Sequence, residues 1–166
     1  MDRGLTELSD ILGQALTERG WMLATAESCS GGLLAGAITA IAGSSGWFDR
    51  GFVTYSNESK VELLGVNPTT LTRYGAVSEE TAREMADGAI ARSRADVAVA
   101  ITGIAGPGGG SIAKPVGTVW LAWRQQHGGT LAETHCIPGD RETVRHRVVT
   151  IALERLIALV RGDANY

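Results

Sequence analysis

The sequence contains few of the residues that build disulfide or metal frameworks. Cys29 and Cys136 are the only cysteines in 166 residues, too few for a disulfide framework or a structural zinc site. The three histidines, His127, His135 and His146, have no metal-ligand spacing and no accompanying Asp signature of a Ser–His–Asp triad. We therefore expect no metal and no cofactor.

Long apolar runs and excess charge are also missing. No run approaches the roughly 20 residues that span a bilayer, and the amphipathic, acidic start "MDRGLTELSDILGQAL" is not a signal peptide. The net charge of −3 does not suggest a nucleic-acid or membrane partner. We expect one cytoplasmic domain over residues 1–166. The basic cluster Arg141, Arg145, His146 and Arg147 indicates either a solvated helix face or an anion site.

The order of predicted elements indicates an α/β protein. Apolar periodicity, capping residues and β-propensity predict helices over 5–19, 31–42, 57–65, 78–94 and 140–160, and strands over 21–26, 51–56, 96–103, 118–124 and 130–136. Helices and strands alternate early, and the last two strands form a hairpin. This order predicts a three-layer α/β/α sandwich with a mixed central sheet. Ligands of such sheets bind at the carboxyl ends of the strands, where "ESCSGG", "YSNESK" and "TGIAGPGGGS" follow three of them.

The first of these loops carries reactive side chains at a strand-to-helix junction. In "TAESCSGGLLAGAITA", residues 25–40, Ser28 can be a nucleophile or an ordinary helix N-cap. In the second loop, Lys60 lies in the first turn of a helix, where the positive helix end favours the neutral amine. A lysine with a lowered pKa suits a Ser–Lys amidase, although a single lysine usually has no such role.

Two further loops have both a functional and a structural interpretation. The glycine-rich segment 102–118 either wraps a phosphate with backbone N–H groups or is a plain flexible loop. It has neither the Walker spacing of a P-loop nor the following helix of a dinucleotide fingerprint. The segment "AGSSGWFDRG", residues 42–51, contains Ser45, but it also suits a loop that ends a helix and packs Trp47 and Phe48.

Several long stretches together resemble one family. "AESCSGG", "AGSSGWFDRGFVTYSNESK", "GAVSEETAREMA", "TGIAGPGGGS" with "KPVGTVW", and "GDRETVR" are similar to the nicotinamide-nucleotide amidases, the C-terminal domain family of the competence-damage-inducible protein CinA. The resemblance runs in order over residues 5–160. It is to the stand-alone form, without the N-terminal domain that some members carry. "CSGG" stands where "CTGG" is common, and a hydroxyl is kept.

The resemblance implies hydrolysis of the carboxamide of nicotinamide mononucleotide to nicotinate mononucleotide and ammonia, in pyridine-nucleotide salvage and without metal. It implies Ser28 as nucleophile, Lys60 as base, and Tyr55 and Ser45 as groups that relay or orient the proton. Backbone N–H groups of Gly31 and Gly32, or around Ser45, are then candidates for holding the oxyanion. Arg141 and the glycine-rich loop, with Thr102, Gly103 and Gly106, are candidates for binding the substrate and its 5′-phosphate.

Three alternatives stay open at this point. The chain can be a pyridine-nucleotide sensor with little catalysis, Cys29 can replace Ser28 as nucleophile, or Ser45 can be the attacking serine. We also expect a homodimer or another small homo-oligomer, because Trp47 and Phe48 form an apolar pair in a predicted loop.

Overall fold

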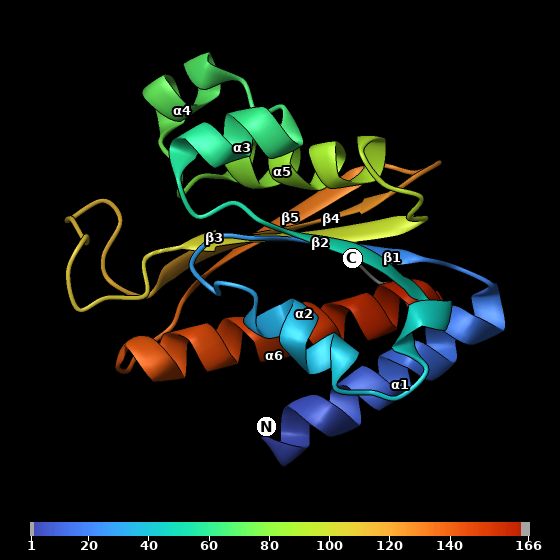
Figure 1. Cartoon of the computed structure of the whole chain (residues 1–166). Coiled ribbons are helices and arrows are strands. Elements are labelled where there is room, and N and C mark those ends of the chain that lie inside the picture. The colour runs from blue at the N-terminus through green and yellow to red at the C-terminus, as the bar shows by residue number, and fades with distance from the viewer. Residues whose placement is uncertain (1, 164–166) are drawn as a thin grey trace.

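The computed structural model describes residues 2–163 and has three layers (Figure 1). A five-stranded sheet lies between α1, α2 and α6 on one face and α3, α4 and α5 on the other. The predicted α/β/α sandwich with a mixed central sheet is confirmed. No helix among residues 2–163 is long and apolar enough to cross a membrane.

The elements follow the predicted order, with one addition. The helices are α1 (Arg3–Arg19), α2 (Leu33–Thr39), α3 (Asn57–Leu64), α4 (Pro68–Tyr74), α5 (Glu79–Ala91) and α6 (Arg141–Arg161), with a short 3₁₀ turn at Ser44–Gly46. The strands are β1 (Leu23–Glu27), β2 (Phe48–Val53), β3 (Val97–Gly103), β4 (Thr118–Gln125) and β5 (Thr130–Cys136).

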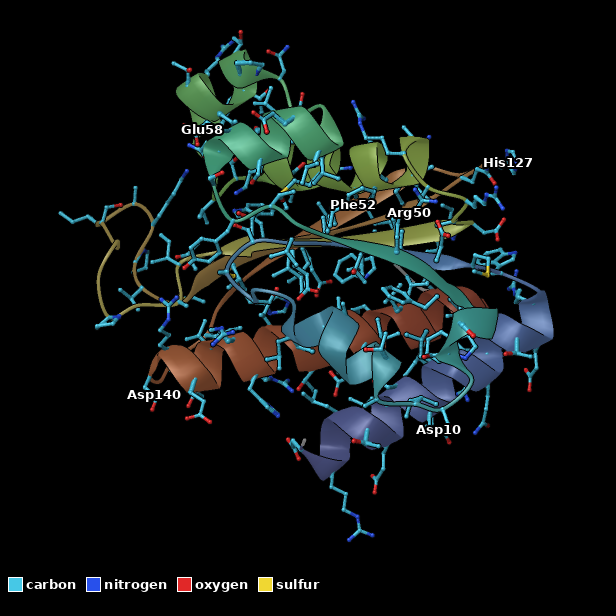
Figure 2. All side chains as sticks on the ribbon, in the orientation of Figure 1. Asp10, Arg50, Phe52, Glu58, His127 and Asp140 are labelled. Carbon is cyan, nitrogen blue, oxygen red and sulfur yellow. The ribbon has the colours of Figure 1, made fainter. Side chains whose placement is uncertain are left out.

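The sheet has the strand order β2-β1-β3-β4-β5. Strand β1 pairs in parallel with both β2 and β3, whereas β4 and β5 are antiparallel and form the predicted hairpin. The carboxyl ends of β1, β2 and β3 therefore meet at one edge of the sheet. Figure 2 shows this edge between Glu58 and Asp140, with His127 at the opposite end of the molecule.

The two faces of the sheet are packed with side chains of different size. Large residues such as Val99 and Ile101 of β3 face α1, α2 and α6, whereas small residues such as Ala98 and Ala100 face α5. This difference follows from the two-residue alternation of a strand. The alanine face allows α5 to lie close to the sheet. The same alternation determines which face of the sheet each polar residue of β1 meets.

Several boundaries differ from the prediction by a few residues, and the starts of two elements and one added helix have local reasons. Strand β2 begins at Phe48 rather than at residue 51, because Trp47 already accepts a hydrogen bond from the Leu23 N–H of β1. Helix α2 begins at Leu33, after two glycines with positive φ. Helix α4 was not predicted, although Asn67 caps it and Pro68 opens it, both ordinary start signals.

Trp47 lies in the core rather than on the surface. Its side chain is 5% exposed and packs on Gly13 of α1, where an added Cβ would lie 2.6 Å from the ring. Phe48 is half-buried against the same core. The exposed apolar pair that motivated the expected homo-oligomer is therefore covered within one chain, and the oligomer stays a prediction without this support.

Candidate active site

A serine hydroxyl and a lysine amine meet at the carboxyl edge of the sheet. Ser28 directly follows β1, and its N–H donates to the Ile101 carbonyl of β3 at 3.0 Å. Lys60 lies in the first turn of α3, with Nζ 3.0 Å from Ser28 Oγ. Lys60 is 1% exposed and Ser28 8% exposed. The structure thus pairs the predicted nucleophile with the predicted base in a site shielded from solvent.

The surroundings of Lys60 favour an amine that accepts a proton. Burial lowers the pKa of Lys60 below its ordinary value of 10.5. Nζ donates to the Thr54 carbonyl at 2.8 Å and lies 3.5 Å from the Tyr55 and Ser56 carbonyls. A neutral amine has two N–H bonds and one lone pair. Two carbonyls can therefore take the N–H bonds while the lone pair faces the Ser28 hydroxyl.

Glu27, and not Ser28, binds the start of the following helix. The fully buried Glu27 carboxylate accepts from the N–H groups of Leu34 at 2.9 Å and Ala35 at 3.0 Å. The helix has Gly32 at its N-cap, with no side-chain cap hydrogen bond. The interpretation of Ser28 as the helix cap is therefore wrong. Strand alternation sends Glu27 toward α2 and Ser28 toward Lys60, which explains the two adjacent polar residues.

The Ser28–Lys60 pair opens into a cavity of about 200 Å³. Five other residues predicted or considered as site residues line it with them: Cys29, Tyr55, Thr102, Gly103 and Arg141. Burial raises the pKa of the Cys29 thiol to about 11, so at neutral pH this side chain is a protonated thiol. The electrostatics of the site thus favour Ser28 over Cys29 as the nucleophile.

Arg141 connects two walls of the cavity. From the start of α6, its Nη2 donates to the Tyr55 hydroxyl at 3.0 Å and its Nη1 donates to the Gly106 carbonyl at 2.9 Å. Asp140 caps the same helix by accepting from the Thr143 N–H at 2.8 Å. The guanidinium therefore lies at the same cavity as Ser28 and Lys60 and joins the glycine-rich loop to the Tyr55 segment.

The two glycines after Ser28 build the turn rather than the cavity wall. Gly31 and Gly32 have φ of 59° and 96°, a region that glycine adopts without strain. The Gly31 N–H already donates to the Ser28 carbonyl at 3.0 Å. Within residues 2–163, the N–H groups of Cys29, Ser30 and Gly32 donate to no backbone carbonyl. Of these three groups, the Cys29 N–H directly follows the predicted nucleophile Ser28, and the sequence did not single it out.

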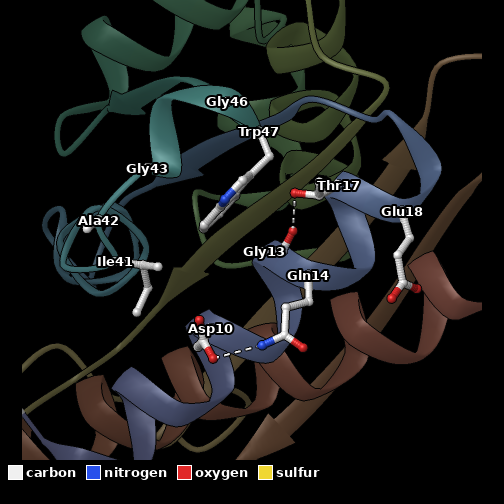
Figure 3. Close-up of a pocket in the computed structure, with 10 residues that line it drawn as sticks. All are labelled: Asp10, Gly13, Gln14, Thr17, Glu18, Ile41, Ala42, Gly43, Gly46 and Trp47. Carbon is white, nitrogen blue, oxygen red and sulfur yellow. Dashed lines mark hydrogen bonds between the residues drawn. The ribbon is translucent and has the colours of Figure 1, made fainter.

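Ser45 is not brought to this site. It precedes β2, whereas Ser28 follows the parallel strand β1, so the six residues of β2 separate them, roughly 20 Å at about 3.3 Å per residue. Its neighbours Gly43, Gly46 and Trp47 line a different hollow against α1 (Figure 3). The grouping of Ser45 with Ser28 is therefore corrected by the parallel pairing of the two strands.

The cavity also has lining residues that lie within the quoted motifs but were not predicted as site residues. Asn57, Ala76, Val77 and Ala105 complete its lining. The Ala76 carbonyl accepts a hydrogen bond from the Thr102 hydroxyl at 2.8 Å, which holds the α4–α5 turn against the end of β3. Asn57 was inside a quoted motif but passed over, and the "GAV" segment carries only aliphatic side chains, which give no chemical signal in a sequence. Within residues 2–163, no three His, Cys, Asp or Glu side chains gather as a metal site.

The comparisons with known proteins agree with this arrangement. The family profile described as the CinA C-terminal domain matches residues 5–160. The chain is 54% identical to the nicotinamide-nucleotide amidohydrolase PncC of Escherichia coli (strain K12), over 93% of this chain and 94% of that protein. It is 48% identical to the Pseudomonas putida protein of the same name, over 93% and 96% of the two chains.

A solved structure gives the same result for the fold. The competence/damage inducible protein CihA from Agrobacterium tumefaciens superposes with a TM-score of 0.92 at 52% identity, covering 96% of this chain and 97% of that one. The arrangement of layers around the cavity is therefore shared with an experimentally determined relative.

Proposed function

Because the chain belongs to the CinA C-terminal domain family, we propose that it hydrolyses the carboxamide of nicotinamide mononucleotide. The products are nicotinate mononucleotide and ammonia, a step of pyridine-nucleotide salvage. One observation carries the proposal: a buried Ser28 hydroxyl 3.0 Å from the amine of Lys60, whose pKa is lowered by burial. Relatives that the chain matches over nearly their whole length are named as amidohydrolases of this nucleotide.

The first half of the reaction forms an acyl-enzyme. Lys60 takes the proton of the Ser28 hydroxyl while Oγ attacks the carboxamide carbon, whose oxygen becomes negative. The positive pyridinium ring makes this carbon more electrophilic. The oxyanion then re-forms the carbonyl, the C–N bond breaks, and the Lys60 ammonium gives its proton to the departing nitrogen. Ammonia leaves, and Ser28 carries the nicotinoyl ester.

The second half uses the same base. Lys60 takes a proton from a water molecule as that water attacks the ester carbon. The bond to Ser28 Oγ then breaks and Oγ regains the proton from Lys60, leaving nicotinate mononucleotide as a carboxylic acid that releases its own proton to solvent. No electrons change hands, and the proton that enters Lys60 in each half leaves it again before that half ends. A neutral amine at the start of both halves is therefore essential.

The cavity supplies groups for the developing charge. The Cys29 N–H follows the proposed nucleophile directly and donates to no backbone carbonyl of the described residues, so we assign it to the oxyanion. Arg141 and Tyr55 lie at the same cavity, and we assign them to positioning the carboxamide. This places Arg141 at the reacting end, whereas the sequence suggested a contact with the 5′-phosphate.

The test is ammonia release from nicotinamide mononucleotide by the purified protein, with and without a chelator. We expect release in both conditions, at rates well above those of heat-inactivated protein. Loss of activity on chelation that returns with added metal would contradict the Ser–Lys mechanism. Tight binding of the nucleotide without ammonia release would favour the sensor interpretation instead.

A further inference from the structure

A second hollow adjoins the catalytic cavity. It lies between the α4–α5 turn, the end of the glycine-rich loop and β4, and has a volume of about 480 Å³. Val77 lines both this hollow and the catalytic cavity, so the two spaces are neighbours across one side chain. We call it the α4–α5 hollow; Lys114, Arg73, Glu80 and Trp120 are among its lining residues.

The catalytic cavity is too small for a whole nucleotide. Its volume of about 200 Å³ is below the roughly 300–1,000 Å³ of typical small-molecule sites. A pyridine carboxamide requires only the space next to Ser28 and Lys60. The ribose and phosphate of the same molecule must therefore extend into an adjoining space.

The α4–α5 hollow offers two cations from separate segments. Lys114, in the glycine-rich loop that projects beyond the sheet in Figure 1, donates from Nζ to the Tyr74 carbonyl at 2.7 Å. This bond holds the ammonium at the rim and leaves two of its three N–H groups for a ligand. Arg73 of α4 lies over the Tyr74 ring, with its guanidinium carbon 5.3 Å from the ring centre. Both side chains belong to exposed or half-buried residues.

The same hollow contains carboxylates, which limit the kind of ligand it fits. Glu79 is engaged by Arg83 Nε at 2.8 Å, so its charge is matched. Glu80 is exposed and forms no hydrogen bond within the described chain. A lone carboxylate repels a phosphate but accepts from sugar hydroxyls. Cations and a free carboxylate in one hollow therefore fit a sugar phosphate better than a bare anion.

We propose that the α4–α5 hollow binds the ribose 5′-phosphate part of the substrate, with Lys114 and Arg73 on the phosphate and Glu80 on the ribose hydroxyls. The inference rests on the proposed function, because it assumes that the carboxamide lies at Ser28. It moves phosphate recognition from Arg141 to Lys114. The glycine-rich loop then contributes a side chain at its far end as well as the Gly106 carbonyl near the cavity.

Kinetics with two substrates test this assignment. Lys114→Ala and Arg73→Ala are compared with wild type on nicotinamide mononucleotide and on the riboside, which lacks the phosphate. We expect Lys114→Ala to raise KM for the nucleotide about tenfold or more. Because the bound substrate and the transition state share the phosphate contact, kcat should change less than about twofold. Turnover of the riboside should be unchanged. Arg3→Ala is the matched control, since it removes a positive charge at an exposed site of α1.

A labelling experiment gives a readout besides activity. Lys60 and Lys114 are the lysines of the sequence, and Lys60 is buried, so Lys114 is the side chain that an amine-reactive reagent should modify. Peptide mass spectrometry separates this modification from that of the α-amino group. Ribose 5-phosphate should slow this modification several-fold, whereas ribose should not. Equal modification with and without ribose 5-phosphate, or equal kinetic losses on nucleotide and riboside, would overturn the inference.

The outcomes separate the two proposals. If wild type hydrolyses the nucleotide but Lys114→Ala behaves like wild type and Lys114 is not protected, the hollow is not the phosphate site and the proposed function stands. If Lys114 is protected but no ammonia is released, the hollow binds a sugar phosphate and the proposed function is wrong.

Discussion

Lys60 Nζ lies 3.0 Å from Ser28 Oγ, although 32 residues separate them in the chain. Two parallel strands create this contact: β1 ends at Glu27 just before Ser28, and β2 ends at Val53 just before the segment that leads into α3. The Thr54 N–H donates to the Glu27 carbonyl at 2.8 Å and continues the pairing. The Thr54 carbonyl then accepts from Lys60, so the sheet itself positions the base.

Replacing Ser28 should abolish turnover, whereas replacing Cys29 should not. Ser28→Ala removes the nucleophile, and such changes lower kcat by about 10⁴–10⁶-fold. Cys29→Ala removes a buried thiol whose pKa is about 11, so kcat should stay within about tenfold of wild type while the melting temperature falls. Steady-state ammonia release and thermal unfolding measure the two effects. The reverse pattern would make Cys29 the nucleophile.

Ser45→Ala provides the control for serine removal. Ser45 is exposed and lies at the opposite end of β2 from the cavity, so kcat and KM should match wild type. A loss of activity comparable with that of Ser28→Ala would show that Ser45 contacts the substrate in a way one chain does not allow.

The pH dependence of kcat/KM should report the protonation of Lys60. The neutral amine is the active form, and burial lowers its pKa below 10.5. Activity should therefore fall as pH decreases through that lowered pKa and level off above it. A pH–rate profile fitted to one ionisation measures the value. An acid limb whose midpoint lies at or above 10.5 would contradict an amine tuned by burial.

The same burial predicts a gain of stability when Lys60 is replaced by Met. The unfolded chain keeps its proton up to about 10.5 and the folded chain releases it earlier, so wild-type stability rises with pH between these two values. Below that range the full cost of burying the ammonium is present. Lys60→Met should therefore be more stable by about 1 kcal/mol or more at neutral pH, and the difference should shrink toward pH 10. Urea unfolding at both pH values measures it, and inactive protein with unchanged stability would contradict the burial argument.

The layers, and most of the residues that meet in the candidate site, could be predicted from the sequence for physical reasons. Strands and amphipathic helices have characteristic periods of apolar residues, which are visible in the sequence. Ser28 and Lys60 lie inside motifs long enough to resemble one family, to which the chain belongs. Glu27 illustrates the limit. Its position in the motif was visible, but the side of β1 that it faces depends on the register and on the start of α2, which two glycines delay to Leu33.

Ser45 and Val77 show what a motif leaves out. A motif gives the order of residues along the chain but not their positions in space. Ser45 of "GSS" was therefore grouped with Ser28, although the length of β2 separates it from the cavity. Two lining residues, Ala76 and Val77, come from the α4–α5 turn, and α4 itself is a short helix with no buried residue among those described. Aliphatic residues that only shape a wall carry no chemical signature that sequence analysis can detect.

Arg141 should affect nucleotide and riboside alike. Its guanidinium donates to both the Tyr55 hydroxyl and the Gly106 carbonyl, a bridge that the single ammonium of lysine cannot reproduce. Arg141→Lys should therefore lower kcat for both substrates by a similar factor, of about tenfold for one charge-assisted hydrogen bond. A selective rise of KM for the nucleotide would return Arg141 to the phosphate. Arg147→Lys, on the same helix and outside the cavity lining, is the matched control.

Glu27→Gln should loosen the turn that carries the nucleophile. Both carboxylate oxygens accept a backbone N–H, from Leu34 at 2.9 Å and from Ala35 at 3.0 Å. A glutamine has one acceptor oxygen, so its NH₂ group must face the second N–H, and a buried donor loses its partner. Hydrogen bonds to a charged group are worth about 1.5–3 kcal/mol, and the free energy of unfolding should fall by about that amount. Because α2 then holds the Ser28–Gly32 turn less firmly, kcat should also fall, with KM nearly unchanged. Urea unfolding and steady-state kinetics measure the two effects, and Glu58→Gln, at an exposed site in the first turn of α3, is the control. If Glu27→Gln unfolds at the same urea concentration as wild type, the carboxylate does not stabilise the start of α2, and the turn is held by the strand pairing of Ser28 alone.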